Sequence, residues 1–272
     1  MSNKYFSPQG LSWVSNLMFS EVGIKIGAEK GYLIETRLSP IVRKYSLQNI
    51  EALIDGAKNG NSNYKQEIID ALTTNETSFF RDSKPFDTLE KITIPEFIKK
   101  NSATRTLRIW SSACSSGQEA YSIKIILDRF IELKGWNIQI IGTDISKEIV
   151  NRANNGAYSQ FEIQRGLPTK ELVKYFDKRE GEWVAKPILK SGVNFKVENI
   201  FRPSNAFNKY DIVFCRNLLI YFDTEHKKKA LNNIHSQMNQ GGHLYIGGAE
   251  TLMGIHGGFT LRKEFHGLYE KS

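Results

Sequence analysis

The sequence is poor in cysteine, because its 272 residues include only Cys114 and Cys215. Two cysteines cannot form a disulfide framework, so a reducing, cytoplasmic location is expected. Five scattered histidines and no Cys-X-X-Cys pair argue against a structural zinc site. No run reaches about 18 apolar residues, so no segment is expected to cross a bilayer or insert into it directly. Residues 1–10 lack the apolar stretch of a secretory signal, and none is expected.

Glycine is scarce where nucleotide-binding enzymes usually carry it. The segment IWSSACSSGQEAYSI (109–123) contains Gly117 alone, so the Gly-X-Gly-X-X-Gly pattern of dinucleotide-binding proteins is missing. The same segment has no Gly-Lys-Ser/Thr, which excludes a phosphate-binding P-loop. A nicotinamide-dependent oxidoreductase is therefore disfavoured.

The composition is that of an ordinary globular protein, with 40% hydrophobic, 24% charged and 11% aromatic residues. The formal net charge is +8, and it is unevenly distributed. Residues 1–72 hold 8 basic and 7 acidic residues, so nearly all of the excess lies in residues 73–272. A basic excess favours an acidic partner, which could be nucleic acid, an acidic protein surface or a phosphorylated cofactor.

Two regions with different patterns follow one another along the chain. Residues 1–72 show apolar residues at helical spacing, which predicts a small helical domain. From about residue 103, apolar strand patterns alternate with helical ones, and this predicts a doubly wound, parallel α/β sheet in residues 73–272. The predicted strands lie in residues 106–113, 137–146, 209–222 and 241–248, with a last one in the tail.

A small β excursion interrupts the α/β pattern. Residues 182–197 (EWVAKPILKSGVNFKV) are typical of short antiparallel strands rather than of a strand–helix–strand unit. We expect a β subdomain at about residues 175–197, inserted into the α/β domain.

Two neighbouring loops carry candidate ligand-binding residues. Small residues at 111–117 would let a ligand approach the backbone next to a helix N-terminus, although a plain strand-to-helix turn has the same appearance. Asp144 ends the next predicted strand, where a carboxylate can accept hydrogen bonds from both ribose hydroxyls. Asp144 could equally be the N-cap of the following helix.

Two further segments combine aromatic and polar residues. In TTNETSFFRD (73–82), Phe79 and Phe80 could simply fill the core, but this leaves the neighbouring Thr, Asn and Arg residues unexplained. In FCRNLLIYFD (214–223), polar residues follow an apolar strand at the edge of the sheet where ligands bind. Tyr221 in this segment could also be a core residue with its hydroxyl at the rim.

Together these motifs resemble one family. The order and spacing of five segments are similar to those of the chemotaxis receptor methyltransferases, the CheR family, over roughly residues 10–270: TNETSFFRD (74–82), WSSACSSGQEAYS (110–122), GTDIS (142–146), GAYSQFEIQRGLP (156–168) and FCRNLLIYFD (214–223). The resemblance implies a Rossmann-like methyltransferase domain in residues 73–272 and a receptor-recognition role for residues 1–72. It implies methyl transfer from S-adenosylmethionine, without a metal, to glutamate side chains on the cytoplasmic helical bundle of methyl-accepting chemotaxis receptors. S-adenosylhomocysteine would be the product.

The resemblance also implies which residues form the site. The residues that match the family's cofactor site are Asn75, Thr77, Arg81, Glu119, Asp144, Asn199, Ile200, Arg216 and Asn217. Arg81 and Tyr221 match the positions nearest the transferred methyl group, and they are the predicted catalytic residues.

The residue types suit this chemistry. Asp144 suits the ribose diol, Glu119 suits the ammonium group, and Arg81 could bind either the cofactor carboxylate or the substrate carboxylate with two hydrogen bonds. A glutamate with a reference pKa of about 4.3 is already anionic at neutral pH, so no general base is needed. Positioning of the reacting atoms then supplies the catalysis and can contribute about 7–11 kcal/mol.

Two features depart from the family. Pro40 interrupts the helix that carries receptor-binding basic residues in the family, and Lys30, Arg37 and Lys44 share one face only if that helix continues through Pro40. They could also form an ordinary solvated stripe. The excursion around YFDKREGEWVAKP is compact, so we predict a protein that does not depend on a receptor's C-terminal pentapeptide.

Competing classes of protein lack support in the sequence. None of the seven prolines is adjacent to another, which excludes the Asp/Asn-Pro-Pro-Tyr/Phe motif of amino-methylating nucleic-acid enzymes. Neither cysteine follows a proline, so the cytosine C5 enzymes are excluded too. A non-catalytic binding module would be expected to lose Arg81, Glu119 or Asp144, and all three are present. We therefore expect no nucleic-acid partner.

Overall fold

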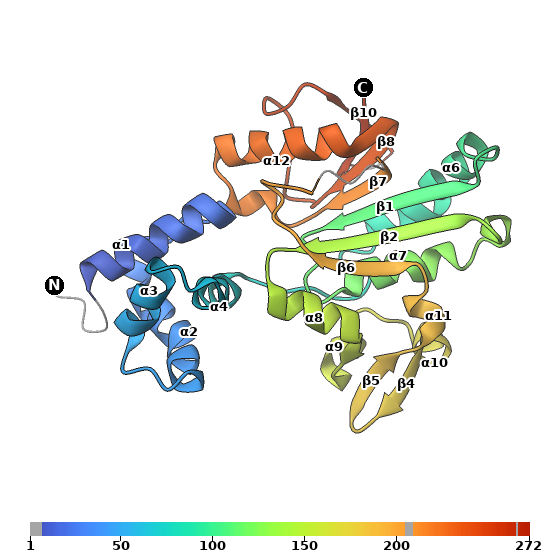
Figure 1. The fold of residues 1–272 in the computed structure, drawn as a ribbon. Helices are drawn as coiled ribbons and strands as arrows, with labels where there is room; N and C mark the ends of the chain where they lie inside the picture. Colours follow the sequence, from blue (N-terminus) through green and yellow to red (C-terminus); the bar gives the residue numbers. More distant parts are fainter. Residues whose placement is uncertain (1–6, 205–208, 265) are drawn as a thin grey trace.

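The computed structural model describes residues 7–204, 209–264 and 266–272 (Figure 1). Its first part is helical, with α1 (Pro8–Leu17), a short π-helix η1 (Met18–Val22), a short 3-10 helix η2 (Ala28–Lys30), α2 (Gly31–Lys44), α3 (Ile50–Lys58) and α4 (Ser62–Leu72). These helices bury an apolar cluster of their own, which includes Val14, Met18, Ile34, Leu38, Leu53 and Ile68. Within the described ranges, no helix is both long enough and apolar enough to cross a membrane.

Helix α2 continues through Pro40. A proline inside a helix removes one backbone hydrogen bond and costs about 3 kcal/mol. Ile34, Leu38 and Ile41 are buried on either side of it, so packing against α3 and α4 compensates for the lost bond. The helix is therefore continuous at Pro40, where the sequence alone allowed either a kink or the start of a new helix.

The basic residues of α2 are largely engaged within the molecule. Arg37 Nη1 donates to the carbonyl oxygens of Ala71 (3.2 Å) and Thr73 (3.1 Å), and Lys44 pairs with Glu67 of α4. Two of the three cations expected to share a solvated or receptor-facing stripe thus hold α2 against α4 and the chain that follows it.

The central sheet has seven strands in the described part of the chain, in the order β6–β2–β1–β7–β8–β10–β9. They are β1 (Thr106–Ser112), β2 (Asn137–Asp144), β6 (Val193–Val197), β7 (Tyr210–Cys215), β8 (Met238–Ile246), β9 (Phe259–Leu261) and β10 (Leu268–Lys271). The first five are parallel, while β10 runs antiparallel to both β8 and β9. The expected parallel sheet is confirmed, and the tail supplies two strands instead of one.

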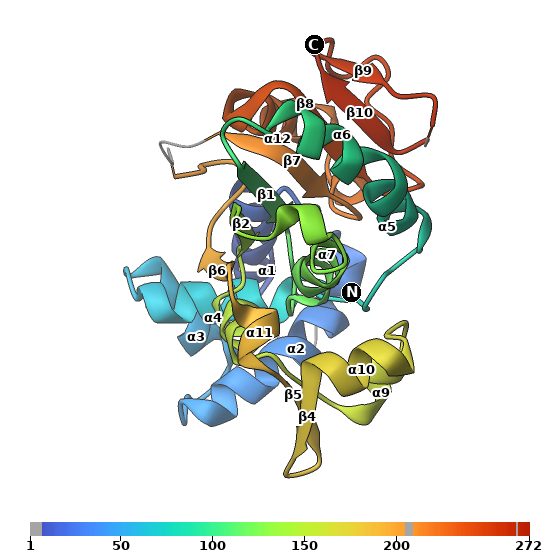
Figure 2. The same ribbon diagram turned by 90° about the vertical axis from the view of Figure 1, so that its right-hand side faces the viewer.

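Helices cover both faces of this sheet (Figure 2). One face packs against α5 (Lys84–Thr88), η3 (Leu89–Thr93), α6 (Ile94–Lys100), α7 (Gln118–Leu127), η4 (Ile131–Leu133) and α8 (Lys147–Asn155). The other face packs against α12 (Thr224–Gln237), whose Leu231 and Ile234 join Trp110 and Val213 in a second cluster. Because the chain leaves β1 toward β2 on one side and returns to β7 on the other, the order of strands reverses between β1 and β7. Ligands bind at such a reversal in open α/β sheets.

The small β excursion differs from its prediction. A separate sheet in the order β3–β5–β4 is formed by β3 (Ala157–Tyr158), β4 (Phe176–Arg179) and β5 (Glu182–Ala185), accompanied by α9 (Gln160–Gln164), α10 (Thr169–Tyr175) and α11 (Pro187–Lys190). The expectation of antiparallel strands throughout 182–197 is wrong for β6, which pairs in parallel with β2 in the central sheet. The alternating pattern of β6 shows that it is a strand but not which strand it pairs with.

The helices α1–α4 lie beyond the carboxyl ends of the parallel strands (Figure 1). Gln66 Nε2 of α4 donates to the carbonyl oxygen of Ile145 (2.9 Å), just after β2. Asp70 accepts from the backbone N–H of Lys147 (3.1 Å) at the start of α8. These bonds fix the helical region against the loop that follows β2.

Candidate active site

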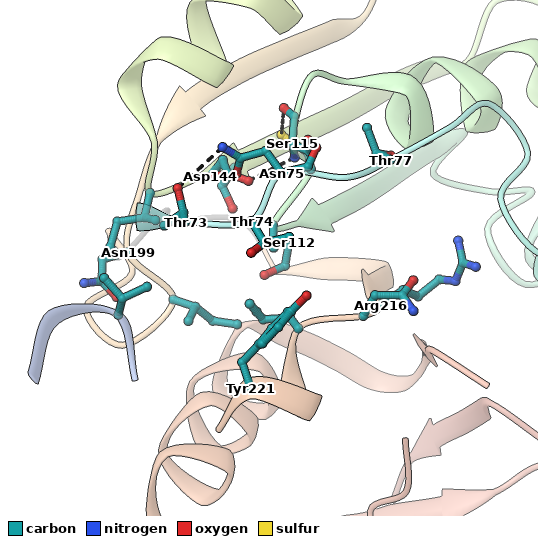
Figure 3. Close-up of a pocket in the computed structure, with 18 of the residues that line it drawn as sticks. Thr73, Thr74, Asn75, Thr77, Ser112, Ser115, Asp144, Asn199, Arg216 and Tyr221 are labelled. Atoms are coloured by element: carbon teal, nitrogen blue, oxygen red, sulfur yellow. Dashed lines mark hydrogen bonds between the residues drawn. The ribbon is translucent and has the colours of Figure 1, made fainter. Parts of the chain in front are cut away.

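A cleft opens at the carboxyl ends of β1, β2 and β7. Its walls come from residues 73–81, from the loops after these strands, from the chain after β6, and from residues 21–24 of the helical region (Figure 3). The cleft brings together every residue predicted for the site, namely Asn75, Thr77, Arg81, Glu119, Asp144, Asn199, Ile200, Arg216, Asn217 and Tyr221.

Asp144 ends β2 at the floor of the cleft and is 7% exposed. Its Oδ2 accepts from the backbone N–H of Ser115 (2.9 Å), and its Oδ1 accepts from that of Ser146 (3.0 Å). The N-cap of α8 is Ser146, so Asp144 does not fill the capping role that the sequence left open. Each carboxylate oxygen has two lone pairs, so both can accept a further hydrogen bond. Burial raises the pKa of Asp144 above its usual value.

The loop between β1 and α7 is drawn close to Asp144. Ser115 Oγ donates to the carbonyl oxygen of Asn75 (2.7 Å), which ties this loop to the segment after α4. Gly117 has φ +92°, and a Cβ there would lie 2.9 Å from the ring of Phe195. The single glycine of the motif is therefore required for the turn and for the packing beside it.

Glu119 and Arg216 form a buried ion pair in the wall. Arg216 Nη1 donates to Glu119 Oε2 (3.0 Å), and the side chain of Arg216 is 2% exposed. Arg216 Nη2 also donates to Asp82 Oδ2 (2.7 Å) and to the carbonyl oxygen of Arg81 (2.8 Å). The second Glu119 oxygen accepts from Ser111 Oγ (2.8 Å). The Arg216 guanidinium thus fixes Glu119 and the chain at Arg81–Asp82 from within the protein.

The two predicted catalytic residues occupy the more open part of the cleft. Arg81 is half-buried, and its Nη1 donates to the carbonyl oxygen of Glu76 (2.9 Å). Tyr221 ends the 3-10 turn η5 (Leu219–Tyr221), is 40% exposed and points into the cleft from the side opposite Asp144 (Figure 3). Tyr221 is therefore a rim residue and not a core residue. Phe79 is fully buried, so the core-filling interpretation of its segment holds for this aromatic while the polar neighbours line the cleft.

Asn199, Ile200 and Asn217 line the cleft. The hydrogen bonds of Asn199 and Ile200 are made within the protein and have structural roles. Asn199 Nδ2 donates to the carbonyl oxygen of Glu21 (2.8 Å), and its Oδ1 accepts from the N–H of Phe201 (2.9 Å). The Ile200 carbonyl accepts from Asn233 Nδ2 (2.9 Å). Asn199 therefore attaches the helical region to the wall of the cleft.

Sequence reasoning missed two contributions to the site. Residues 21–24 line the cleft, although this stretch carries no motif and shows only an interruption of a helical pattern. Glu250 follows β8 and is 5% exposed, and its carboxylate holds the backbone of the loop after β7. The only available signal for Glu250 was an acidic residue in the Gly-Gly-Ala-Glu segment that follows an apolar strand pattern.

Cys114 lines the cleft but does not suit nucleophilic chemistry. Burial raises the pKa of its thiol well above the usual value, so the thiol is neutral at neutral pH. Across the part of the chain that the structure describes, no group of three or more His, Cys, Asp or Glu side chains is placed to hold a metal ion.

A parallel sheet whose strand order reverses at β1, with a buried carboxylate at the end of β2 facing a small-residue loop, is a Rossmann-like nucleoside-binding architecture. With its antiparallel β10 beside β8 and its cleft at the reversal, the fold has the Rossmann-like arrangement that the sequence motifs implied for a methyltransferase domain.

Comparison with known proteins identifies the particular family. The family model described as "CheR methyltransferase, SAM binding domain" matches residues 75–267. The chain is 40% identical over 240 residues to "Chemotaxis protein methyltransferase Cher2" of Pseudomonas putida, covering 86% of each chain. It is 39% identical over 236 residues to "Chemotaxis protein methyltransferase 1" of Pseudomonas aeruginosa, covering 85% of each. The chain belongs to the CheR methyltransferase family, as the sequence motifs predicted.

Proposed function

We propose that this protein transfers a methyl group from S-adenosylmethionine to glutamate side chains on the cytoplasmic helical bundle of methyl-accepting chemotaxis receptors. The products are glutamate methyl esters and S-adenosylhomocysteine. The observation that carries the proposal is the single cleft in which all ten predicted residues meet, in a chain of the CheR family. The names of the relatives from Pseudomonas connect their activity with chemotaxis.

The residues of the cleft fit the cofactor in kind and place. Asp144 would accept from the ribose hydroxyls, because its remaining lone pairs face a cleft that it helps to line. Glu119, held in orientation by Arg216 and Ser111, would accept from the ammonium group. When bound, S-adenosylmethionine supplies a methyl group on a positively charged sulfur.

Arg81 and Tyr221 would act on the substrate side. Arg81 would hold the glutamate carboxylate with two parallel N–H donors, and Tyr221 would help to place it at the methyl group. The carboxylate oxygen would form the new bond to the methyl carbon, and the electron pair of the broken carbon–sulfur bond would stay on sulfur. Because a glutamate is anionic at neutral pH, the protein needs only to orient it and exclude water.

The proposal is tested by incubating the protein with tritiated S-adenosylmethionine and receptor-containing membranes. A methyl ester is labile to base, so the label should appear in the receptor band and be released by mild alkali. Base-stable label would contradict carboxyl methylation and point to nitrogen or to nucleic acid. The same assay without receptor gives the background.

Arg81→Ala is expected to reduce methyl transfer at least about tenfold while the protein stays folded, because a charged donor pair to the substrate is lost. Initial rates at saturating S-adenosylmethionine measure the effect. Arg165→Ala is the matched control. This substitution also removes a positive charge beside Glu76, but Arg165 does not line the cleft. Wild-type turnover in folded Arg81→Ala would remove Arg81 from the mechanism.

We also propose that methylation is independent of a receptor C-terminal pentapeptide. The β4–β5 hairpin closes through Glu180 and Gly181 alone, both at positive φ, and β3 adds only two residues to its sheet. Deleting the last five residues of the cognate receptor should change the methylation rate by less than about twofold, a difference of under about 0.5 kcal/mol in binding. A clear loss of binding or methylation on truncation would show that this small sheet does tether the receptor. A role of residues 1–72 in receptor recognition belongs to the same proposal.

A further inference from the structure

We infer that Glu250 is a positioning residue for methyl transfer, because its buried carboxylate fixes the turn that carries Tyr221 into the cleft. This inference rests on the proposed function. Glu250 lies just after β8 and is 5% exposed, and it is not among the residues that line the cleft. It would act only through the backbone that it holds.

The carboxylate of Glu250 joins the ends of two neighbouring strands. Its Oε2 accepts from the backbone N–H of Gly247 (2.6 Å), after β8, and from that of Asn217 (3.1 Å), after β7. Its Oε1 accepts from the N–H of Ile220 (3.2 Å), in the middle of the turn η5. One side chain therefore satisfies three backbone donors, two of them in the loop that lines the cleft.

The loop after β7 depends on this anchor. Asn217 has φ +57°, a left-handed conformation that an L-residue adopts at a cost unless its surroundings hold it. In the turn itself Leu219 is buried, but Ile220 is 50% exposed and Tyr221 is 40% exposed. Packing therefore fixes one side of the turn, and the bond from Ile220 to Glu250 fixes its backbone.

Gly247 leaves room for the anchor. A Cβ at Gly247 would lie 2.8 Å from Glu250 Oε2 and 3.0 Å from the backbone nitrogen of Asn217. The glycine thus permits the close approach of the carboxylate to both strands. Glu250 and Gly247, both after the end of β8, together shape the loop after β7.

Glu250→Gln tests the inference with a nearly isosteric change. An amide keeps one acceptor oxygen, and the better arrangement retains the two bonds at Oε2, which leaves an NH₂ group facing the N–H of Ile220. Amide hydrogen exchange at residues 217–221 should then become at least about tenfold faster, because the turn opens locally. Turnover on receptor should fall by about tenfold, since small misplacements of a reacting group are costly. The dissociation constant for S-adenosylhomocysteine should change by less than about twofold, because the bond to the N–H of Asn217 is retained and Asp144 and Glu119 are undisturbed.

Asp211→Asn is the matched control. Asp211 is also a buried carboxylate, 6% exposed, and it accepts from the N–H of Arg108 (2.9 Å) and from Asn239 Nδ2 (2.9 Å). It lies at the start of β7, away from the cleft. Asp211→Asn should lower the melting temperature but leave turnover within about twofold of wild type, an effect of under about 0.5 kcal/mol on the barrier. An equal loss of turnover in both variants would reduce Glu250 to a general stabilising residue and overturn the inference.

A double-mutant cycle with Tyr221→Phe asks whether Glu250 acts through Tyr221. If it does, Glu250→Gln should lower turnover much less in the Tyr221→Phe background than in the wild type. Equal losses in the two backgrounds, or unchanged amide exchange at residues 217–221, would overturn the inference. The exchange measurement needs no substrate. A wild-type protein that failed to methylate receptors would thus refute the proposed function, while the exchange result would still decide whether Glu250 holds the turn.

Discussion

Asp144→Asn is expected to weaken the binding of S-adenosylhomocysteine by about tenfold to a hundredfold. Hydrogen bonds to a charged group contribute roughly 1.5–3 kcal/mol each, and the amide replaces one acceptor oxygen with a donor. In the structure that oxygen also accepts from the N–H of Ser115 or Ser146, so the substitution would disturb the neighbouring loop as well as the proposed ribose contact. Calorimetric titration of both proteins measures the difference.

Asp70→Asn is the control for the loss of a carboxylate near α8. Asp70 accepts from the N–H groups of Lys147 and Glu148, but it does not line the cofactor cleft. Asparagine is about as good as aspartate at a helix N-terminus, so this variant should bind S-adenosylhomocysteine like the wild type. Equal dissociation constants for wild type and Asp144→Asn would leave Asp144 with a purely structural role.

The affinity for S-adenosylhomocysteine should also depend on pH through Asp144. Burial raises the pKa of Asp144, so its carboxylate takes up a proton at a higher pH than an ordinary aspartate, whose pKa is about 3.9. Protonation removes the charge and one acceptor, so affinity should fall as the pH is lowered. The fall should begin above the ordinary range of aspartate. Asp144→Asn should lack this dependence.

Arg216→Met is expected to lower the free energy of unfolding by about 3–5 kcal/mol, because removing one partner of a buried ion pair leaves the other charge uncompensated. Arg216 is 2% exposed in its side chain, and Glu119, its partner, is 12% exposed. Methionine keeps most of the volume, so the loss measures charge and hydrogen bonding more than packing. Urea denaturation monitored by tryptophan fluorescence gives the value.

The double variant Arg216→Met with Glu119→Gln separates the contributions. Without the carboxylate no buried charge is left unpaired, so the double variant should regain part of the stability lost by Arg216→Met. Arg81→Ala, which removes a half-buried arginine with one bond to a carbonyl oxygen, should lose only about 1 kcal/mol. If Arg216→Met and Arg81→Ala lowered the free energy of unfolding by a similar, small amount, this would contradict the conclusion that the buried ion pair of Arg216 stabilises the protein.

Much of the α/β region was predictable because its signals are local. The strand that ends at Asp144 and the helix that follows it can be inferred from GTDIS and the apolar run before it. Likewise, β7 and the loop after it follow from FCRNLLIYFD. In a parallel sheet, residues that follow neighbouring strands meet at one edge. The sequence alone therefore predicts that Asp144 and Arg216 line the same cleft.

The remaining features depend on partners distant in the sequence. The pattern of Val193–Val197 shows a strand, but its parallel pairing with β2 is a tertiary choice. Pro40 indicated a break, and the burial of Ile34 and Ile41 overrides it. The role of Glu250 depends on backbone N–H groups about thirty residues earlier, and no side-chain pattern reports those.

The wall formed by residues 21–24 has a consequence for how this family can diversify. If α1–α4 recognise the receptor, as we propose, they would be simple to exchange between relatives only if a linker alone attached them. Here Glu21 is bonded to Asn199, and Gln66 and Asp70 hold the loop after β2, so the same helices complete the cofactor cleft. A chimaera that replaces α1–α4 with the helices of a relative would have to keep these three contacts, or its cleft would bind the cofactor more weakly.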